Sequence, residues 1–288
     1  MQTNDSHCVD PGPPAQEMHQ RFQEHWGLEQ VPFPSGNDPR LFYQGASQNE
    51  ALARLRFLIA NARRCGLLLA EPGLGKSMLQ AVFAEHAQRQ GFAVAQVDLT
   101  AITAREFYGQ LGEKLSAGVK REDSLPEAFC RLADQLQVNR WQGTPTLLLL
   151  DDVAQAGPDL LAQLVRLSRI DPSSDSRLTL VLATDSAGVS RLSEPLLDLV
   201  DLRIDLEPWD EADTIGYLQH ALVEAGANRP LFNDGALAEI DRLAAGVPRQ
   251  VNRLADQALL AGYRGGVDTI GADAVQQAAV AINFPVGA

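Results

Sequence analysis

The sequence has little cysteine, no long apolar run and no excess of positive charge, and each shortage speaks against a class of protein. Its three cysteines are far apart, form no Cys-x-x-Cys pair and have no histidine at metal-ligand spacing. We therefore expect reduced thiols, not disulfides or a zinc site. No apolar run approaches the roughly 20 residues needed to cross a bilayer. The net charge of -13 argues against a protein whose main work is to grip a phosphate backbone.

The first residues, MQTNDSHCVDPGPPAQE, are polar and rich in proline. They lack the basic start and the apolar run of a signal peptide, so we predict a cytoplasmic protein. Residues 1–23 are predicted to be a disordered tail, because residues 1 to about 18 show no periodicity. The aromatic segment 25–45 has no regular period either, and we predict an extended arm that docks on a core. Ser47-Gln-Asn-Glu50 fits a capping box and predicts the start of a helix.

From residue 66 onward, apolar runs alternate with helical patterns. The apolar runs predict strands at 66–70, 92–99, 146–152, 178–184 and 200–206. The helical patterns between them lie at about 75–90, 103–117, 126–138 and 158–170. This alternation predicts the α/β class, with a parallel five-stranded sheet covered by helices on both faces. After Trp209 only helical patterns remain, at about 210–225, 234–245, 248–263 and 271–282. We therefore predict a core domain at 24–206 and a small all-helical domain at 207–288.

The stretch AEPGLGKS, residues 70–77, lies between a predicted strand and a predicted helix, which is the context of a phosphate-binding loop. Gly73 and Gly75 would let backbone N–H groups converge on phosphate oxygens. Lys76 would place a positive charge on the β- and γ-phosphates, and Ser77 a hydroxyl on Mg²⁺. The residues predicted to line the nucleotide are Glu71, Pro72, Gly73, Leu74, Gly75, Lys76, Ser77 and Met78. Ala70 replaces the first glycine of the motif, which is tolerable if its φ stays negative. The alternative is a glycine-rich turn without a ligand.

Carboxylates and other polar side chains end the next predicted strands. Asp151 is positioned to hold Mg²⁺ and Asp152 to polarise an attacking water, because ligands bind at the carboxyl ends of parallel strands. The alternative is a helix-capping aspartate with a solvated neighbour. Thr184 and Asp185 are candidates for contact with the γ-phosphate or the water, or are ordinary loop residues. Arg249, in the first turn of a later helix, could reach the γ-phosphate or could be a surface group.

Together these motifs resemble those of AAA+ ATPases. More narrowly, the arm WGLEQVPFPSGNDPRLFY and the segment GVPRQVNRLADQALLAGY resemble the ExeA/GspA-type general secretion pathway ATPases, over roughly residues 24–282. The resemblance implies a P-loop NTPase core of the AAA+, ASCE type with a helical lid, ATP and Mg²⁺ as ligands, and homo-oligomers with nucleotide at subunit junctions. It also implies a catalytic role for Lys76, Asp152 and Arg249. It places Phe33 and Arg40 near the adenine.

The sequence departs from this family at four places. Ala70 replaces a glycine, and Asp152 replaces a glutamate that is one methylene longer. Thr184-Asp185 stands where the family often has Gly-Gln. Leu199 occupies the expected place of the arginine finger, for which Arg191 or Arg203 would have to substitute. Such a finger accelerates hydrolysis by orders of magnitude, so its absence weakens the prediction of fast turnover.

The leading interpretation is an ATP-hydrolysing, oligomeric protein that assembles or remodels a secretion or pilus complex in the cell envelope. A second interpretation is a DNA-associated ATPase of the transposition-helper kind. The negative net charge disfavours DNA as a partner, although Arg242, Arg249, Arg253 and Arg264 could form a local basic face. A third interpretation is a switch that binds nucleotide and hardly hydrolyses it. Secretion members of the family continue through a membrane helix, so the sequence is either a piece of such a protein or a stand-alone ATPase.

Overall fold

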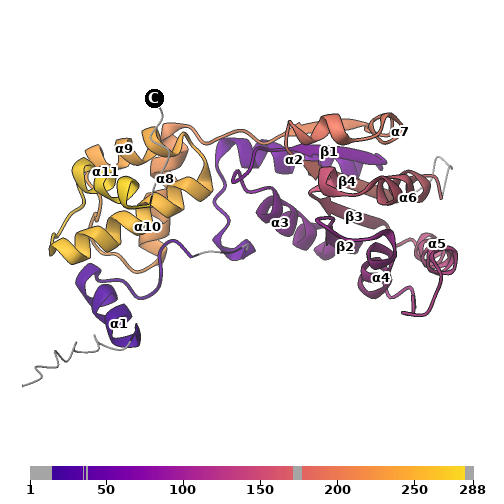
Figure 1. Ribbon diagram of the computed structural model, residues 1–288, viewed down its shortest axis with the longest axis horizontal. Coiled ribbons are helices and arrows are strands. Elements are labelled where there is room, and N and C mark those ends of the chain that lie inside the picture. The colour runs from indigo at the N-terminus through magenta and orange to yellow at the C-terminus, as the bar shows by residue number, and fades with distance from the viewer. Residues whose placement is uncertain (1–14, 35, 37, 171–176, 283–288) are drawn as a thin grey trace, which may run out of the picture. The chain divides into compact units, whose positions relative to one another are not determined.

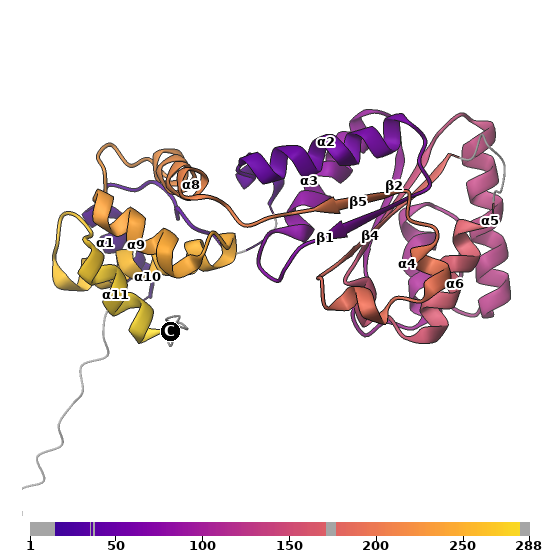
Figure 2. The same cartoon turned by 90° about the horizontal axis from the view of Figure 1, so that it is seen from above.

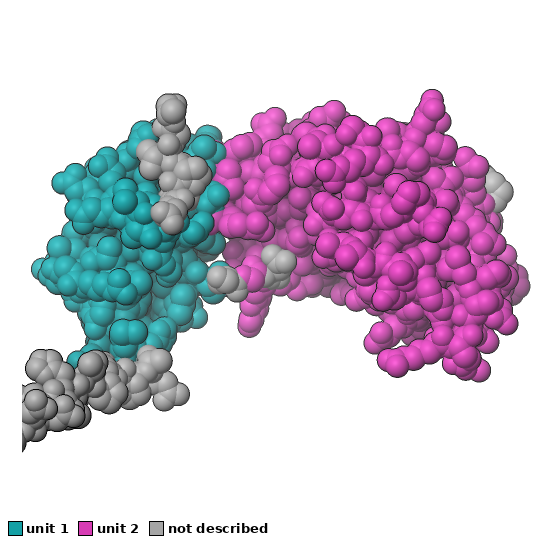
Figure 3. Space-filling model, viewed as in Figure 1, with its two compact units in different colours: residues 1–34, 210–246, 250–288 teal, residues 35–209, 247–249 magenta. Residues whose placement is uncertain are grey.

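The chain was analysed as a computed structural model, which describes residues 15–34, 36, 38–170 and 177–282. These residues fall into two compact units (Figure 3). The core unit contains the described parts of 35–209 together with 247–249, and the helical unit contains 15–34, 210–246 and 250–282. The observed boundary at Trp209 and Asp210 lies close to the predicted one at 206/207. Residues 24–34, which we assigned to the core as part of its arm, group with the helical unit instead.

A parallel five-stranded sheet forms the centre of the core unit, as predicted (Figures 1 and 2). Its strands are β1 (Cys65–Leu69), β2 (Ala93–Asp98), β3 (Thr146–Asp151), β4 (Leu178–Thr184) and β5 (Leu202–Asp205). They are arranged in the order β2-β3-β4-β1-β5, and each neighbouring pair is parallel. Because all strands run the same way, their carboxyl ends meet at one edge. The register there places Asp98 beside Asp151 and Leu69 beside Thr184.

Helices cover both faces of this sheet, because successive strand residues point to opposite faces. The core-unit helices are α2 (Ala46–Ala60), α3 (Lys76–Arg89), α4 (Ala104–Lys114), α5 (Leu125–Trp141), α6 (Pro158–Ser168) and α7 (Glu194–Leu197). Three short 3-10 helices are η1 (Pro39–Leu41), η2 (Val153–Gln155) and η3 (Gly188–Arg191). Leu147 and Leu149 pack in one apolar cluster with α2 and α3. Leu148 and Leu150 pack in a second cluster with α4, α5 and α6. Each such side chain stabilises the fold by roughly 1.5–3 kcal/mol through burial.

The predicted capping box at Ser47 is wrong. Helix α2 already begins at Ala46, after the N-cap Gly45, which makes no side-chain capping bond. The Ser47 hydroxyl instead accepts the N–H of Glu207 at 2.7 Å, just beyond β5. A tertiary hydrogen bond has therefore taken the side chain that the local pattern assigned to capping. Complete capping boxes do occur at the starts of α4 and α5.

The helical unit consists of α1 (Ala15–Trp26), α8 (Glu211–Glu224), α9 (Asp234–Ala244), α10 (Pro248–Gly265) and α11 (Ala272–Ala281). Helix α10 starts in the stretch 247–249, which groups with the core unit. Helix α1 corrects two predictions, since its residues were assigned to a disordered tail and an extended arm; residues 1–14 of that tail lie outside the described residues. Phe22 packs edge-to-face on Tyr263 of α10, and Trp26 is only 1% exposed. Packing of this kind stabilises a short helix that its own propensity would hold only marginally. Among the described helices, none is both long and apolar enough to cross a membrane.

Candidate nucleotide-binding site

Two glycines in the left-handed region shape the turn from β1 to α3. Gly73 has a φ of 94° and Gly75 a φ of 96°, conformations that side chains strongly disfavour. A Cβ atom on Gly73 would also lie 3.0 Å from Cγ1 of Val247 and 3.3 Å from Cβ of Arg249. The turn delivers the chain directly into the first turn of α3, whose N–H groups have no partners within the helix. This is the geometry of an anion cradle.

Ala70 is accommodated as we expected. Its backbone is not in the left-handed region, and the residue is only 3% exposed. Its N–H donates to the carbonyl of Thr184 at 3.1 Å, which ties the start of the loop to the end of β4. The missing first glycine therefore imposes no backbone strain. Of the other predicted loop residues, Glu71 and Pro72 are exposed, Leu74 is buried and Met78 is half-buried.

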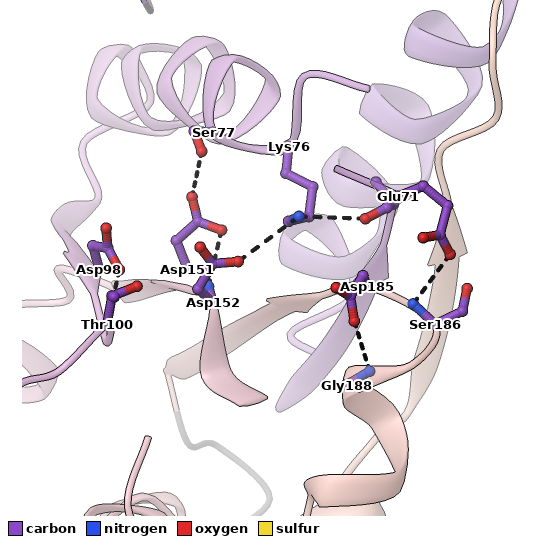
Figure 4. Close-up of polar contacts among 11 residues, drawn as sticks. Glu71, Lys76, Ser77, Asp98, Thr100, Asp151, Asp152, Asp185, Ser186 and Gly188 are labelled. Atoms are coloured by element: carbon purple, nitrogen blue, oxygen red, sulfur yellow. Dashed lines mark hydrogen bonds and ion pairs between the residues drawn. The ribbon is translucent and has the colours of Figure 1, made fainter. Parts of the chain in front are cut away.

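The structure brings four of the predicted residues together at the carboxyl edge of the sheet (Figure 4). The Ser77 hydroxyl donates to Oδ2 of Asp151 at 2.5 Å. Lys76 Nζ donates to the Ala70 carbonyl at 3.3 Å and lies 3.8 Å from Oδ1 of Asp152. A hydroxyl and a carboxylate in contact are oxygen ligands of the kind that Mg²⁺ prefers, and phosphate oxygens and water complete such a site. The residues present therefore fit a magnesium ion together with a nucleotide. No set of three or more His, Cys, Asp and Glu side chains in the described part of the chain is arranged to hold a metal without a nucleotide.

Asp152 lies in an unusual backbone position. Its φ of 48° and ψ of 45° are left-handed, which aspartate tolerates better than most residues. Its N–H donates to Oδ1 of the preceding Asp151 at 3.0 Å. Partial burial raises the pKa of Asp152, the Asp151 carboxylate raises it further, and the Lys76 ammonium opposes both effects. Asp98 and Asp185 also raise it, so the carboxylates at this edge repel one another and favour a cation.

The end of β4 is held in place by hydrogen bonds that the sequence did not reveal. Thr184, only 2% exposed, is the last residue of β4. Asp185 accepts the N–H of Gly188 through Oδ1 at 2.6 Å, so this carboxylate shapes the turn into η3. Glu71 of the loop accepts the N–H of Ser186 at 3.4 Å (Figure 4). The phosphate-binding loop is therefore tied to the turn that follows β4, through a contact between distant segments that no local pattern could indicate.

The remaining predicted residues lie in three different settings. Arg249 is beside the loop, because its N–H donates to the carbonyl of Gly73 at 3.3 Å. Arg40 forms an ion pair with Asp38 at 2.6 Å, and its side chain is 87% exposed. Hydrogen bonds from Arg40 hold the pKa of Asp38 below its usual value. The short helix η1, which contains Arg40, packs against α3. Phe33 belongs to the helical unit and is buried there, with its ring centroid 6.3 Å from that of Tyr217.

The candidates for an arginine finger also differ in their surroundings. Leu199, which stands at the expected position, packs against the apolar cluster under α6. Arg203 forms three hydrogen bonds with Asp205 on the edge strand β5. Arg191 lines an open hollow of about 600 Å³ together with Ala154, Leu161 and Pro195. Arg203 is therefore held by a carboxylate of its own strand, whereas Arg191 lies in η3 and forms no ion pair among the described residues.

Comparisons with known proteins agree with this geometry. Residues 59–191 match the family described as "AAA domain". The chain is 25% identical over 249 residues to General secretion pathway protein A of Aeromonas hydrophila. The match covers 85% of this chain and 45% of that protein, so the chain spans less than half the length of this relative.

Solved structures show the same fold at low sequence identity. The Orc1 protein of Aeropyrum pernix in complex with DNA superimposes with a TM-score of 0.65 and 21% identity, covering 83% of this chain and 66% of that one. Drosophila ORC bound to DNA gives a TM-score of 0.69 at 16% identity, covering 98% and 70%. The RuvB Holliday junction branch migration motor of Thermotoga maritima gives 0.56 at 17% identity, covering 88% and 74%. The chain therefore has the fold of these solved structures, contains a segment that matches the AAA domain family, and over most of its length is similar to General secretion pathway protein A.

Proposed function

We propose that the chain binds ATP with Mg²⁺ and hydrolyses it. The observation that supports this proposal best is the meeting of Lys76, Ser77, Asp151 and Asp152 at one edge of the sheet, next to a loop with two left-handed glycines. A glycine-rich turn without a ligand would not need a lysine, a hydroxyl and two carboxylates from separate segments to converge there. We assign Ser77 and Asp151 to the magnesium ion, and the backbone of residues 71–78 to the phosphates.

The residues of the chain have separable tasks in this reaction. When bound, Mg²⁺ neutralises phosphate charge and fixes the phosphate oxygens. Lys76, whose ammonium is only 3.8 Å from Asp152 and whose side chain is 11% exposed, would exchange that contact for the β- and γ-phosphates. Asp152, released from that pair, orients a water and accepts its proton as the water oxygen attacks the γ-phosphorus and the bond to the bridging oxygen breaks. Arg249 lies near enough to the loop to contribute a further positive charge, and the end of β4 is held by the bond of Thr184 to Ala70 and that of Asp185 to Gly188.

We further propose that ATP turnover drives the assembly or remodelling of a secretion or pilus complex by a homo-oligomer. The match to General secretion pathway protein A supports a role in secretion. The match to the AAA domain family supports an oligomer with nucleotide at subunit junctions. Arg191 is our candidate for the residue that acts on the nucleotide of a neighbouring subunit. The proposal places the chain on the cytoplasmic side of the envelope, where ATP is available.

The test is Mg²⁺-dependent phosphate release, measured alongside light scattering with and without ATP. We expect release from the wild type, at least about a hundredfold less from Lys76→Ala, and unchanged release from Lys114→Ala on the exposed end of α4. A rise in scattering mass with ATP would support the oligomer. Phosphate release that does not depend on Mg²⁺, or that survives Lys76→Ala, would rule the proposal out.

One observation favours a second candidate, a nucleotide-dependent switch with little hydrolysis. Asp152 is shorter than glutamate, is held in a left-handed backbone position and has a raised pKa. A shorter side chain on a constrained backbone reaches less far toward the attacking water, which favours the switch, whereas the raised pKa by itself makes the carboxylate a stronger base. Tight ATP binding with turnover near background would favour the switch, and brisk turnover would exclude it.

Charge speaks against the DNA-associated alternative. The described part of the helical unit has 13 acidic residues and 5 basic ones. Of the arginines that could have formed a basic face, Arg242 is paired with Glu239 at 2.8 Å and Arg253 donates to the carbonyl of Ile282. Salt-sensitive DNA binding at low ionic strength would be the observation that revives this alternative.

A further inference from the structure

A buried amide without partners lies on the helix that follows the phosphate-binding loop. Gln80 of α3 is 0% exposed, and neither Nε2 nor Oε1 has a hydrogen-bond partner within the described residues. Leaving a buried donor or acceptor unpaired costs roughly 1–3 kcal/mol. A leucine or methionine at this position of α3, whose buried Leu79 and Phe83 belong to an apolar cluster, would avoid that cost. The position is therefore unfavourable for a glutamine in this state of the protein.

The helix geometry places this amide directly below the nucleotide site. At 3.6 residues per turn, Gln80 falls between Lys76 and Ser77 on the circumference of α3, one turn further along. Both neighbours point to the carboxyl edge, Ser77 to Asp151 and Lys76 to Asp152 (Figure 4). Helical side chains also lean toward the start of their helix, so the Gln80 amide is directed back toward those two contacts.

A metal ion at this edge would take an oxygen from each of Ser77 and Asp151. Ser77 would ligate through a lone pair and could still donate its O–H to Asp151, so the metal would add to the demand on the carboxylate without supplying a donor to orient it. Asp151 is 6% exposed, so it has little access to further donors from solvent. Its other oxygen already accepts the N–H of Asp152. A carboxylate ligand of a metal is normally oriented by a second hydrogen-bond donor.

We propose that Gln80 is a positioning residue for the magnesium site, and that its Nε2 amide donates to the Asp151 carboxylate in the metal-bound state. The amide of Gln80 then has a hydrogen-bond acceptor when Mg²⁺ and nucleotide are bound and has none when they are absent. This inference rests on the proposed nucleotide function, and it adds a residue that no phosphate-binding motif includes.

The experiment compares Gln80→Leu, with Gln80→Met as a second variant should leucine fold poorly, and Gln48→Leu as the matched control. Gln48 is a buried glutamine on α2 of the same unit, and its Oε1 also lacks a partner in the described chain. The melting temperature is measured without ligand, and then with a non-hydrolysable ATP analogue at increasing Mg²⁺. The Mg²⁺ concentration at half of the ligand-induced shift is the readout, so catalysis is not required.

We expect both leucine variants to melt at a higher temperature than the wild type without ligand, because Gln80→Leu removes an unpaired amide and Gln48→Leu an unpaired amide oxygen. Only the Gln80 variant should need about tenfold more Mg²⁺ to reach half of the shift, the effect typical of losing an outer-sphere partner. Equal Mg²⁺ midpoints for wild type and Gln80→Leu would overturn the inference while leaving the proposed function intact. A wild type whose melting temperature does not respond to the analogue with Mg²⁺ would overturn both, and is recognisable because no protein in the series would respond.

Discussion

The core unit and the helical unit treat polar side chains differently. In the core, buried polar residues include Asp151 and Thr184 at strand ends and Gln80 on α3, all close to the candidate site. In the helical unit, Thr214 is the buried polar residue among those described, and its hydroxyl donates to Asp241 at 2.7 Å, joining α8 to α9. The core therefore buries some polar groups beside the candidate site and others, such as Asn139 and Thr179, in structural hydrogen bonds, whereas the buried polar residue described in the helical unit joins two helices.

The two units also differ in net charge. The described core contains 19 basic and 20 acidic residues, while the described helical unit contains 5 and 13. Most of the negative charge of the chain therefore belongs to the unit without the P-loop. A nearly neutral core avoids adding long-range repulsion to a site that must receive a polyanion. The acidic surface of the other unit favours solubility and disfavours nucleic acid. Substitutions matched across the two units can test this division.

The largest expected effect is on the rate of phosphate release, when one carboxylate in the core is neutralised and one in the helical unit serves as the control. Asp152→Asn should slow phosphate release by about 10²–10⁴-fold, because the amide cannot accept the proton of the attacking water. Binding of a fluorescent ATP analogue should persist, since Lys76, Ser77 and Asp151 are untouched. Asp234→Asn, in the first turn of α9, is the control and should leave release unchanged. Wild-type release from Asp152→Asn would show that another group acts as the base.

Replacing a glycine with alanine should lower the stability of the protein at the chosen position in the core and raise it at the chosen position in the helical unit. A Cβ atom on Gly188 would lie 2.6 Å from Cβ of Ala154 and closer still to Oγ1 of Thr184. Gly188→Ala should therefore cost about 1–3 kcal/mol by overpacking, and should slow hydrolysis by displacing the end of β4. Gly235→Ala in α9 meets only Asn233 at 3.4 Å and Ala272 at 3.9 Å, and should stabilise by about 0.5–1 kcal/mol. Thermal melting measures both, and a destabilised Gly235→Ala would contradict the comparison.

Replacing one buried threonine in each unit should show that a hydrogen bond to a carboxylate stabilises the fold more than a hydrogen bond to a backbone carbonyl. Thr214→Val removes the donor to the Asp241 carboxylate and should cost about 1.5–2 kcal/mol. Thr179→Val in the core removes a bond to the carbonyl of Arg63 and should cost about 1 kcal/mol or less. Chemical denaturation gives both values. If the core variant loses more stability than the helical one, the idea that the helical unit depends on this pair is wrong.

The smallest effect is a dependence of stability on pH in the helical unit. Partial burial raises the pKa of Asp256 in α10 above its usual 3.8, so the folded protein holds this proton more tightly than the unfolded chain. The stability linked to the group is thus present below about pH 3.8 and is lost as pH rises through the folded pKa. Asp256→Asn avoids that loss, and should raise the melting temperature by roughly a degree or two at pH 7 and not below pH 3.8. A gain that is independent of pH would point to packing instead of ionisation.

The sheet could be predicted from sequence because its strands are continuous apolar runs separated by helical patterns. The same runs placed Asp151 and Thr184 at strand ends, and the shared edge of a parallel sheet then brought them together. Helix α1 was missed because the proline-rich start of the chain was interpreted as disordered, although Phe22 and Trp26 have the four-residue spacing of a helix and both pack against α10. Locally plausible pairings also failed where a distant group competed. Ser47 bonds Glu207 instead of capping α2.

Within the site, sequence supplied the identities of the ligands but not how they are held. The motif indicated Lys76 and Ser77, yet nothing local indicated that Glu71 would hold the turn after β4, or that Asp185 would bond Gly188. Gln80 gave no signal either, since a glutamine on a helix reads as a surface residue. Its burial becomes visible only when the sheet and α3 are packed together.

The order of segments along the chain has a consequence for synthesis. Helix α1 is translated before the core, yet the surface that covers Trp26 and Phe22 belongs to α10, more than two hundred residues later. During translation these aromatic side chains lack their partners on α10 until that helix has left the ribosome. Contacts so distant in sequence form slowly, and exposed apolar groups invite wrong partners meanwhile. The core can therefore fold first. The helical unit can be completed only after α10 has been made, although α1 precedes the whole core in the sequence.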